Sequence, residues 1–248
     1  MEPSTATPAA STATIPERVA SLDWARIEAE LEERGCATTG RAVLTPSECA
    51  QLIRGYDSEE AFRSVVVMAR HRFGRGEYKY FGYPLPRAVA ALRAALYPRL
   101  APVANRWEKA LGRGAEYPRD LESFLQRCHA AGQSRPTPLM LKYGEGDYNC
   151  LHQDLYGELV FPLQVAFLLS APGEDFSGGE LVLTEQRPRM QSRAEVVALE
   201  RGEGVVFAVN QRPVRGARGV YRVVMRHGVS RIRSGRRFTL GIIFHDAQ

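Results

Sequence analysis

Short apolar runs dominate the chain from Leu139 onward, and they constrain the fold more than any other feature of the sequence. Gly, Pro and Asp bound these runs, and short apolar runs between turn residues are typical of β-strands. Seven such runs at short spacing predict an antiparallel sandwich or barrel. The runs are PLMLKYG, VFPLQVAFLLS, GELVLTE, AEVVALE, GVVFAVN, YRVVMRHGVSRI and RRFTLGIIFH.

The first half of the chain carries a helical pattern instead. In TPSECAQLIRGY, Thr45 precedes Pro46, and Glu48 follows three residues after the threonine. This is the arrangement of a capping box with proline in the first turn, and it predicts a helix start. The segment RAVAALRAALYPRLAPVANRWEKALG continues the helical pattern, and we expect Pro98 and Pro102 to break or kink that helix.

Together the two halves predict an α+β fold, a jelly roll with a helical N-terminal half packed on one of its sheets. We expect one domain over residues 16–248, with mainly helical support and a substrate segment in 16–135 and the jelly-roll core in 136–248. Residues 1–15 (MEPSTATPAASTATI) are expected to form a disordered tail. A segment of Ser, Thr, Ala and Pro buries too little surface to offset the entropy of ordering it.

The composition excludes several classes of protein. Hydrophobic residues make up 44% of the 248 residues and charged residues 25%, the balance of a soluble globular protein rather than of a collagen or a disordered chain. The sequence contains no stretch of about 18 apolar residues, the length of a membrane helix, and the N-terminus lacks the pattern of a signal peptide. The four cysteines show no CxxC spacing, so we expect free thiols and a cytoplasmic location. The sequence leaves the oligomeric state open.

Positive charge gathers toward the C-terminal end. From Arg187 onward 13 arginines oppose four acidic residues, a local charge of +9, whereas the other 20 basic and 24 acidic residues sum to −4. This asymmetry favours an anionic partner, either a nucleic acid or a small carboxylate ligand. The alternative is a general preference for arginine, because 30 of the 33 basic residues are Arg.

Two histidines and an aspartate are the candidate metal ligands. In NCLHQDLYG, His152 and Asp154 stand two residues apart, and the period of a strand places both side chains on one face. Taken without the rest of the sequence, the same spacing of two residues also fits a polar pair that faces solvent. In RHGVSRIRSGRRFTLGIIFH, the turn-rich centre predicts a hairpin with His227 directly opposite Arg237, their β-carbons about 5 Å apart. Thr239 would point the same way.

The predicted meeting of these side chains indicates iron chemistry. Two His and one carboxylate leave open coordination positions, as in non-haem Fe(II) oxygenases. The guanidinium of Arg237 offers a bidentate fork for a carboxylate beside that centre. Among the five histidines, His152 alone has an acid at +2 and His227 alone has an arginine at +10.

With these residues in place, the sequence resembles the 2-oxoglutarate/Fe(II)-dependent dioxygenases of the double-stranded β-helix fold. The resemblance runs through KYGEGDYNCLHQD, FSGGELVLTE, GEGVVFAV and HGVSRIRSGRRFTLGIIFH. It implies an enzyme that uses Fe(II), 2-oxoglutarate and O2 to hydroxylate a C–H bond, with the two histidines and the aspartate as metal ligands. It also implies that Arg237 pairs with the distal carboxylate of 2-oxoglutarate, assisted by Thr239. Tyr143 matches a tyrosine that hydrogen-bonds the cosubstrate in many members, with a core strand tyrosine as the alternative.

Two branches of this family share motifs with the chain. The His-Gln-Asp triplet is similar to the nucleic-acid demethylases of the AlkB group, whereas the spacing from His227 to Arg237 is similar to prolyl and other amino-acid hydroxylases. The body of the chain also resembles a bacterial oxygenase group linked to damaged DNA. We therefore expect oxidative demethylation or repair of a DNA or RNA base, with peptide or amino-acid hydroxylation as the alternative. An alternative of another class is a non-catalytic jelly-roll module that binds an anion or a nucleic acid.

The segment HRFGRGEYKYFGYPLP, residues 71–86, is the candidate substrate lid or platform. Its rings and cations alternate, which suits a stacked base and a phosphate backbone. In the alternative interpretation the segment is a strand whose rings pack under the jelly roll while its cations face water. The candidate substrate-binding residues are Arg75, Tyr78, Lys79, Tyr80, Phe81 and Tyr83.

Overall fold

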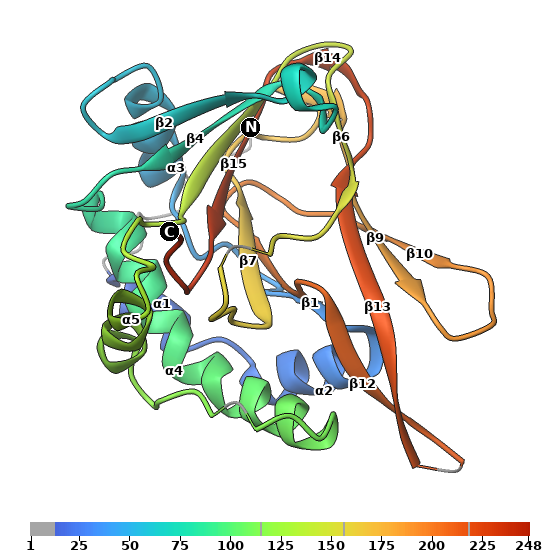
Figure 1. The fold of residues 1–248 in the computed structure, drawn as a ribbon. Helices are drawn as coiled ribbons and strands as arrows, with labels where there is room; N and C mark the ends of the chain where they lie inside the picture. The colour runs from blue at the N-terminus through green and yellow to red at the C-terminus, as the bar shows by residue number, and fades with distance from the viewer. Residues whose placement is uncertain (1–12, 115, 156, 218) are drawn as a thin grey trace, which may run out of the picture.

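Two antiparallel sheets face each other, and the candidate site lies between them (Figure 1). The computed structural model describes residues 13–114, 116–155, 157–217 and 219–248. The larger sheet has the order β1 (Cys36–Thr38), β11 (Gly204–Ala208), β7 (Leu163–Leu168), β15 (Arg237–Ile242), β5 (Leu139–Tyr143), β4 (Glu77–Phe81), β2 (Phe62–Val67). The smaller sheet has the order β10 (Arg193–Val197), β9 (Leu181–Gln186), β13 (Gly219–Val229), β6 (Tyr148–His152), β3 (Gly74–Arg75), with β12 (Gln211–Gly216) also beside β13. A short pair joins β14 (Ile232–Gly235) to β8 (Phe176–Gly178).

Helices cover the outer face of the larger sheet (Figure 1). They are α1 (Ile15–Ala20), α2 (Trp24–Arg34), α3 (Pro46–Gly55), α4 (Arg87–Ala110) and α5 (Leu121–Ala130), with a 3-10 turn, η1, at Met68–His71. The capping box predicted at Thr45 and Glu48 is confirmed at the start of α3. Within the described ranges, no helix combines the length and the apolarity needed to cross a membrane.

Strand β15 shows how the sheet separates core from cavity. Phe238, Leu240 and Ile242 point outward into the cluster that packs against α4. Arg237 and Thr239, at the alternate positions, point inward and line the cavity. The period of two in a strand therefore places an apolar set under the helices and a polar set in the site.

The predicted fold class is confirmed. Each of the seven apolar runs contains a strand, namely β5, β7, β9, β10, β11, β13 and β15. The sheets also take β1 to β4 from the first half, which is less helical than its sequence pattern predicts. Of the tail predicted over residues 1–15, residues 1–12 lie outside the described residues, Thr14 caps α1 and Ile15 is buried. The four cysteines are free thiols, as expected.

The predicted hairpin between His227 and Arg237 is wrong. Strand β13 belongs to the smaller sheet and β15 to the larger one, so the two residues face each other from opposite sheets. The turn-rich segment between them forms β14, which pairs with β8, and Ile232 is fully buried there. The chain thus crosses between sheets where the sequence suggests a local reversal. Both side chains still line one cavity, because each points inward from its own sheet.

Of the break or kink expected at Pro98 and Pro102, the break is contradicted by the structure. Helix α4 runs from Arg87 to Ala110 with Pro98 and Pro102 inside it. Each proline removes an N–H that would bond to the carbonyl four residues earlier, at Ala94 and Pro98 respectively. These positions lie on the exposed face of the helix, where water can bond the freed carbonyls, while Tyr97 and the rest of the opposite face are buried.

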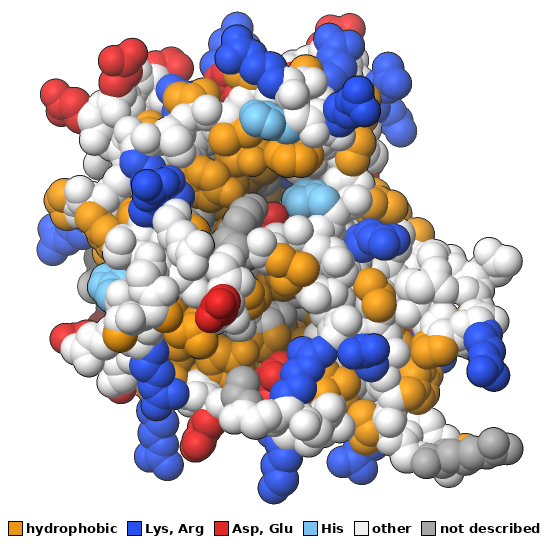
Figure 2. All heavy atoms as spheres, viewed as in Figure 1, with side chains coloured by type: hydrophobic (Ala, Val, Ile, Leu, Met, Phe, Trp, Pro, Cys, Tyr) orange, Lys and Arg blue, Asp and Glu red, His pale blue; other side chains and the backbone are white. Residues whose placement is uncertain are grey.

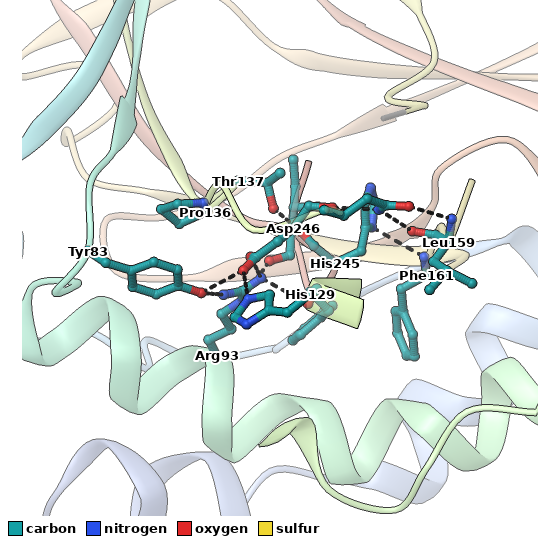
Figure 3. A network of polar contacts seen from close by, with 12 residues as sticks. Tyr83, Arg93, His129, Pro136, Thr137, Leu159, Phe161, His245 and Asp246 are labelled. Carbon is teal, nitrogen blue, oxygen red and sulfur yellow. Dashed lines mark hydrogen bonds and ion pairs between the residues drawn. The ribbon is translucent and has the colours of Figure 1, made fainter. Parts of the chain in front are cut away.

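A buried polar network holds the C-terminal segment against α4 (Figure 3). Arg93 Nη2 donates to Asp246 Oδ1 at 2.7 Å, and both side chains are almost completely buried. The same carboxylate accepts from the hydroxyl of Tyr83 at 2.8 Å and lies 2.8 Å from Nε2 of His129. Because β15 leads into this segment, the network fixes the end of the strand that carries the inward polar residues.

Candidate metal and cosubstrate site

The three candidate metal ligands meet at one point. His227 on β13 stands directly opposite His152 on β6 in the sheet register, and their ring centroids lie 4.2 Å apart. Asp154, just after β6, places Oδ1 3.5 Å from Nε2 of His152 and Oδ2 3.2 Å from Nε2 of His227. One ligand atom from each residue lies within 4.8 Å of the others.

The electrostatics of this group are dominated by the aspartate. Burial by itself would raise the pKa of Asp154, but hydrogen bonds from His152 and His227, together with their charges, hold that pKa well below its usual range. Burial lowers the pKa of His227 despite the aspartate. Burial also acts to lower the pKa of His152, but Asp154 outweighs it and the pKa rises. The group therefore presents a carboxylate between two imidazoles.

The donor set fits a divalent iron ion. The Nδ1 atom of His152 lies 2.8 Å from the carbonyl of Cys150, so this nitrogen carries the proton and donates it. Nε2, which faces Asp154, is then the nitrogen available to a metal ion, and a bound metal would take the place of the proton that hydrogen-bonds this carboxylate. Two imidazole nitrogens and one carboxylate, with space left on the cavity side, are the ligands of the Fe(II) oxygenases.

Sequence reasoning missed Gln164, which contacts this group from the other sheet. Its Nε2 donates to Oδ2 of Asp154 at 2.9 Å and lies 3.3 Å from Nε2 of His227. Its Oε1 is buried and has no hydrogen-bond partner among the described residues. A signal was present in the sequence, because an amide in the middle of the apolar run VFPLQVAFLLS is out of place unless it faces a polar site.

Arg237 lies buried at another part of the same cavity. Its side chain is 3% exposed, makes no ion pair with any described residue, and leaves Nε without a hydrogen-bond partner there. Nη1 lies 3.5 Å from Oγ1 of Thr239, and the guanidinium lies 5.8 Å from the ring centroid of Tyr143. Burial lowers the pKa of Arg237 to about 10, against the opposing effects of Tyr143 and Glu180. A buried cation without a counter-ion is costly, and a carboxylate ligand would compensate it.

Tyr143 is fully buried on β5, directly opposite Arg237 in the register. Its hydroxyl accepts from Nδ2 of Asn149 at 3.3 Å. Burial raises the pKa of this tyrosine, so the hydroxyl stays protonated and can donate to an anion in the cavity. The structure thus brings together the three cosubstrate residues singled out in the sequence.

The cavity joins these two groups and opens to the surface. Its volume is about 220 Å³, and its lining includes the three metal-ligand candidates, Gln164 and Arg237. Most of the other lining residues are apolar, which keeps water away from the polar groups. The half-exposed Phe73 and Leu155 mark the mouth. Figure 2 shows this face, hollowed near its centre, with hydrophobic side chains around the hollow and Lys and Arg above it.

Two strands of the fold, β3 and β4, lie within the segment of residues 71–86 that the sequence marks as a candidate lid or platform. Its strand β4 lies between β2 and β5 in the larger sheet. Of the six candidate substrate residues, Tyr78 lines the cavity. Arg75 is 61% exposed on β3 and lies 3.8 Å from Asp147.

The other four candidate substrate residues make contacts within the fold. Lys79 Nζ donates to the carbonyl of Tyr56 at 2.8 Å. Tyr80 and Phe81 are buried. Tyr83 bonds Asp246 in the network of Figure 3, although its ring is half-exposed. The alternative interpretation, rings packed as a strand, therefore describes most of this segment.

Residues 76–247 match the family described as "Oxygenase, catalysing oxidative methylation of damaged DNA". The chain belongs to this oxygenase family. Over 167 residues the oxygenase is 56% identical to uncharacterised proteins of two Mycobacterium tuberculosis strains, a match that covers 67% of this chain and 72% of each relative.

Solved structures share the fold of the oxygenase at low sequence identity. A Trichoplax adhaerens prolyl hydroxylase, solved with a hypoxia inducible factor peptide, aligns with a TM-score of 0.54 at 14% identity over 96% of this chain and 94% of that one. A Phytophthora capsici prolyl 4-hydroxylase aligns with a TM-score of 0.54 at 14% identity, over 98% of this chain and 69% of that one. A Burkholderia pseudomallei 2-oxoglutarate/Fe(II) oxygenase aligns with a TM-score of 0.50 at 16% identity, over 96% of this chain and 94% of that one. The predicted family and jelly-roll fold are confirmed, and Fe(II), 2-oxoglutarate and O2 are the cofactors of this enzyme class.

Proposed function

We propose that this oxygenase couples the decarboxylation of 2-oxoglutarate to oxidation of a methyl group on a damaged nucleic-acid base. One observation carries the cosubstrate assignment: Arg237 is buried without an acidic partner among the described residues and faces the same cavity as the His-Asp-His group. In this proposal His152, Asp154 and His227 hold the iron. Arg237 binds the distal carboxylate of 2-oxoglutarate, with the hydroxyls of Thr239 and Tyr143 beside it.

Iron with 2-oxoglutarate and O2 supplies the oxidising power for an unactivated C–H bond, which amino-acid side chains lack. The side chains of the protein orient the cosubstrate and the metal ligands and shield them from water. The guanidinium of Arg237 fixes one end of the cosubstrate, and Gln164 holds the carboxylate of Asp154 in place. The apolar lining excludes water from both groups.

The proposed reaction balances with one O2 per methyl group. One oxygen atom enters succinate as 2-oxoglutarate loses CO2, and the other enters the methyl C–H bond. The resulting hydroxymethyl group leaves the base nitrogen as formaldehyde. The description of the family, which names damaged DNA, and the arginine-rich C-terminal region support a nucleic-acid substrate.

The test is mass spectrometry of candidate substrates incubated with protein, Fe(II), 2-oxoglutarate and O2. We expect methylated single-stranded oligonucleotides to lose one methylene and succinate to accumulate, and His152→Ala to abolish both. A gain of one oxygen on proline-containing peptides, with no change in the oligonucleotides, would replace this proposal with peptide hydroxylation. Absence of succinate from the wild-type protein under every condition would instead favour a binding module.

A further inference from the structure

A stacked aromatic pair stands at the mouth of the cavity. The rings of His71 and Phe73 lie with centroids 5.4 Å apart and planes at 22°. His71 is exposed and Phe73 is 47% exposed, yet Phe73 also lines the cavity. An exposed phenyl ring costs free energy in water, and the stack presents a flat apolar surface at the entrance of the site.

The backbone holds this pair in place. The N–H of Phe73 donates to the carbonyl of Met68, and its own carbonyl accepts from the N–H of Cys150 on β6, at 2.8 Å. The next residue, Gly74, has φ of +131°, and a β-carbon there would lie 2.3 Å from the carbonyl oxygen of Tyr148. The stack is therefore fixed against the same strand that carries His152.

Arg72 lies between the two ring residues in the sequence and ends the 3-10 turn η1. Its φ of +60° is the left-handed conformation in which many helical segments end. The rings of the flanking residues stack, and the Arg72 side chain is exposed.

The charge around the rings is positive. Arg70 and Arg72 are exposed and make no ion pair with any described residue. Arg75 is exposed nearby, with Asp147 3.8 Å away, and Arg231 lies 5.9 Å from the ring of Tyr148, the register partner of Arg75. Asp147 and its exposed neighbour Glu145 are the acids of the adjoining turn.

We infer that His71, Phe73 and the arginines at 70 and 72 form a platform for single-stranded DNA, which we call the η1 platform. This inference rests on the proposed function and assigns to it the residues that recognise the substrate. A base stacks on the His71–Phe73 pair next to the base that enters the cavity, and the two arginines bind the flanking phosphates. Rings interleaved with unpaired cations are the composition of sites that bind single strands without reading sequence.

Anisotropy of a fluorescein-labelled oligonucleotide, titrated with full-length protein at several salt concentrations, tests this platform. We expect Phe73→Ala to weaken binding about tenfold, the usual loss when a stacking ring is removed. The slope of log K, where K is the association constant, against log salt concentration is negative. Arg70→Gln and Arg72→Asn should each make it less negative by about 0.7. Asparagine suits position 72 because it tolerates the left-handed conformation. Lys109→Gln, in the last turn of α4, is the matched control and should leave the slope unchanged.

A second readout separates stacking from loss of folding. An oligonucleotide containing 2-aminopurine should be quenched on binding wild type and the arginine variants, and not on binding Phe73→Ala. Equal affinity and quenching for wild type and Phe73→Ala would overturn the platform, as would salt slopes unchanged by both arginine variants. Succinate formation in the absence of any oligonucleotide binding would also overturn it while leaving the oxygenase reaction intact. Absence of succinate with platform-dependent binding would instead refute the proposed reaction alone.

Discussion

Gln164 links the two sheets at the His-Asp-His end of the cavity through its contact with Asp154. The amide Nε2 donates to Oδ2 of the aspartate at 2.9 Å. Gln164 belongs to β7 in the larger sheet, whereas Asp154 follows β6 in the smaller one. The carboxylate is therefore oriented by a group that does not share its sheet.

We predict that Gln164→Leu lowers metal affinity. Leucine keeps a similar volume but removes the donor, so the carboxylate loses a hydrogen bond that orients it. Loss of such an outer partner costs about 10- to 100-fold in affinity. Titration calorimetry with Mn(II) under anaerobic conditions measures the change, and Gln51→Leu on the exposed face of α3 is the matched control. Equal affinities in the two variants would show that Asp154 is oriented without Gln164.

We predict that Arg237 binds the cosubstrate and does not stabilise the ligand-free protein. Arg237→Gln removes a buried, unpaired charge, so the ligand-free variant should be at least as stable as wild type. It should also lose the stabilisation by 2-oxoglutarate, which for a ligand at 100 times its Kd is about 2.7 kcal/mol. Thermal unfolding with Mn(II), with and without 2-oxoglutarate, measures both effects. Arg236→Gln, the exposed neighbour, should respond as wild type does, and a full ligand response in Arg237→Gln would contradict the assignment.

The strands, and which candidate ligands face inward, could be predicted from the sequence because both depend on local periodicity. The arrangement of these strands and side chains in space could not be predicted in the same way. The ten-residue spacing from His227 to Arg237 fits a hairpin, and it fits equally a chain that crosses between sheets through β14. The pairing of Ile232 with Gly178 on β8 decides between them, and that contact is remote in sequence.

The substrate segment shows the same limit. The alternation of Tyr78, Tyr80 and their neighbours predicts rings near cations, but which rings face the cavity depends on the neighbours of β4. Pairing with both β2 and β5 places Phe81 in the core and leaves Tyr78 on the cavity side. The exposed rings at the mouth, His71 and Phe73, precede β4 in a turn whose conformation the pattern does not reveal.

Asp246 is predicted to be structural, together with Tyr83. Asp246→Asn leaves the buried Arg93 without its counter-ion and should lower the free energy of unfolding by about 3 kcal/mol or more. Tyr83→Phe removes the hydrogen bond to the same carboxylate and the one that the hydroxyl accepts from Nη1 of Arg93, and it should cost about 1 kcal/mol for each. Urea unfolding measures both. If Tyr83 contacts substrate instead, Tyr83→Phe will weaken oligonucleotide binding at unchanged stability.

The fully buried His245 should make the fold sensitive to acid. Its Nδ1 accepts from the backbone N–H of Phe161 at 3.2 Å, so the neutral ring is the form that fits. Burial, followed by the charge of Arg93, lowers its pKa from 6.5 to about 4, against the opposing effects of Asp154 and Asp246.

Between pH 4 and 6.5 the unfolded chain binds more protons at this residue than the folded chain does. The free energy of unfolding therefore falls as the pH drops through this window, by up to about 3 kcal/mol from His245 alone. His245→Asn keeps a carbonyl acceptor for Phe161 but does not titrate. Urea unfolding of both proteins at pH 7 and pH 4.5 isolates the histidine, because the carboxylates contribute equally to each. The wild type should lose more stability than the variant, and equal losses would mean that the ring stays neutral in the unfolded chain as well or is protonated in both states.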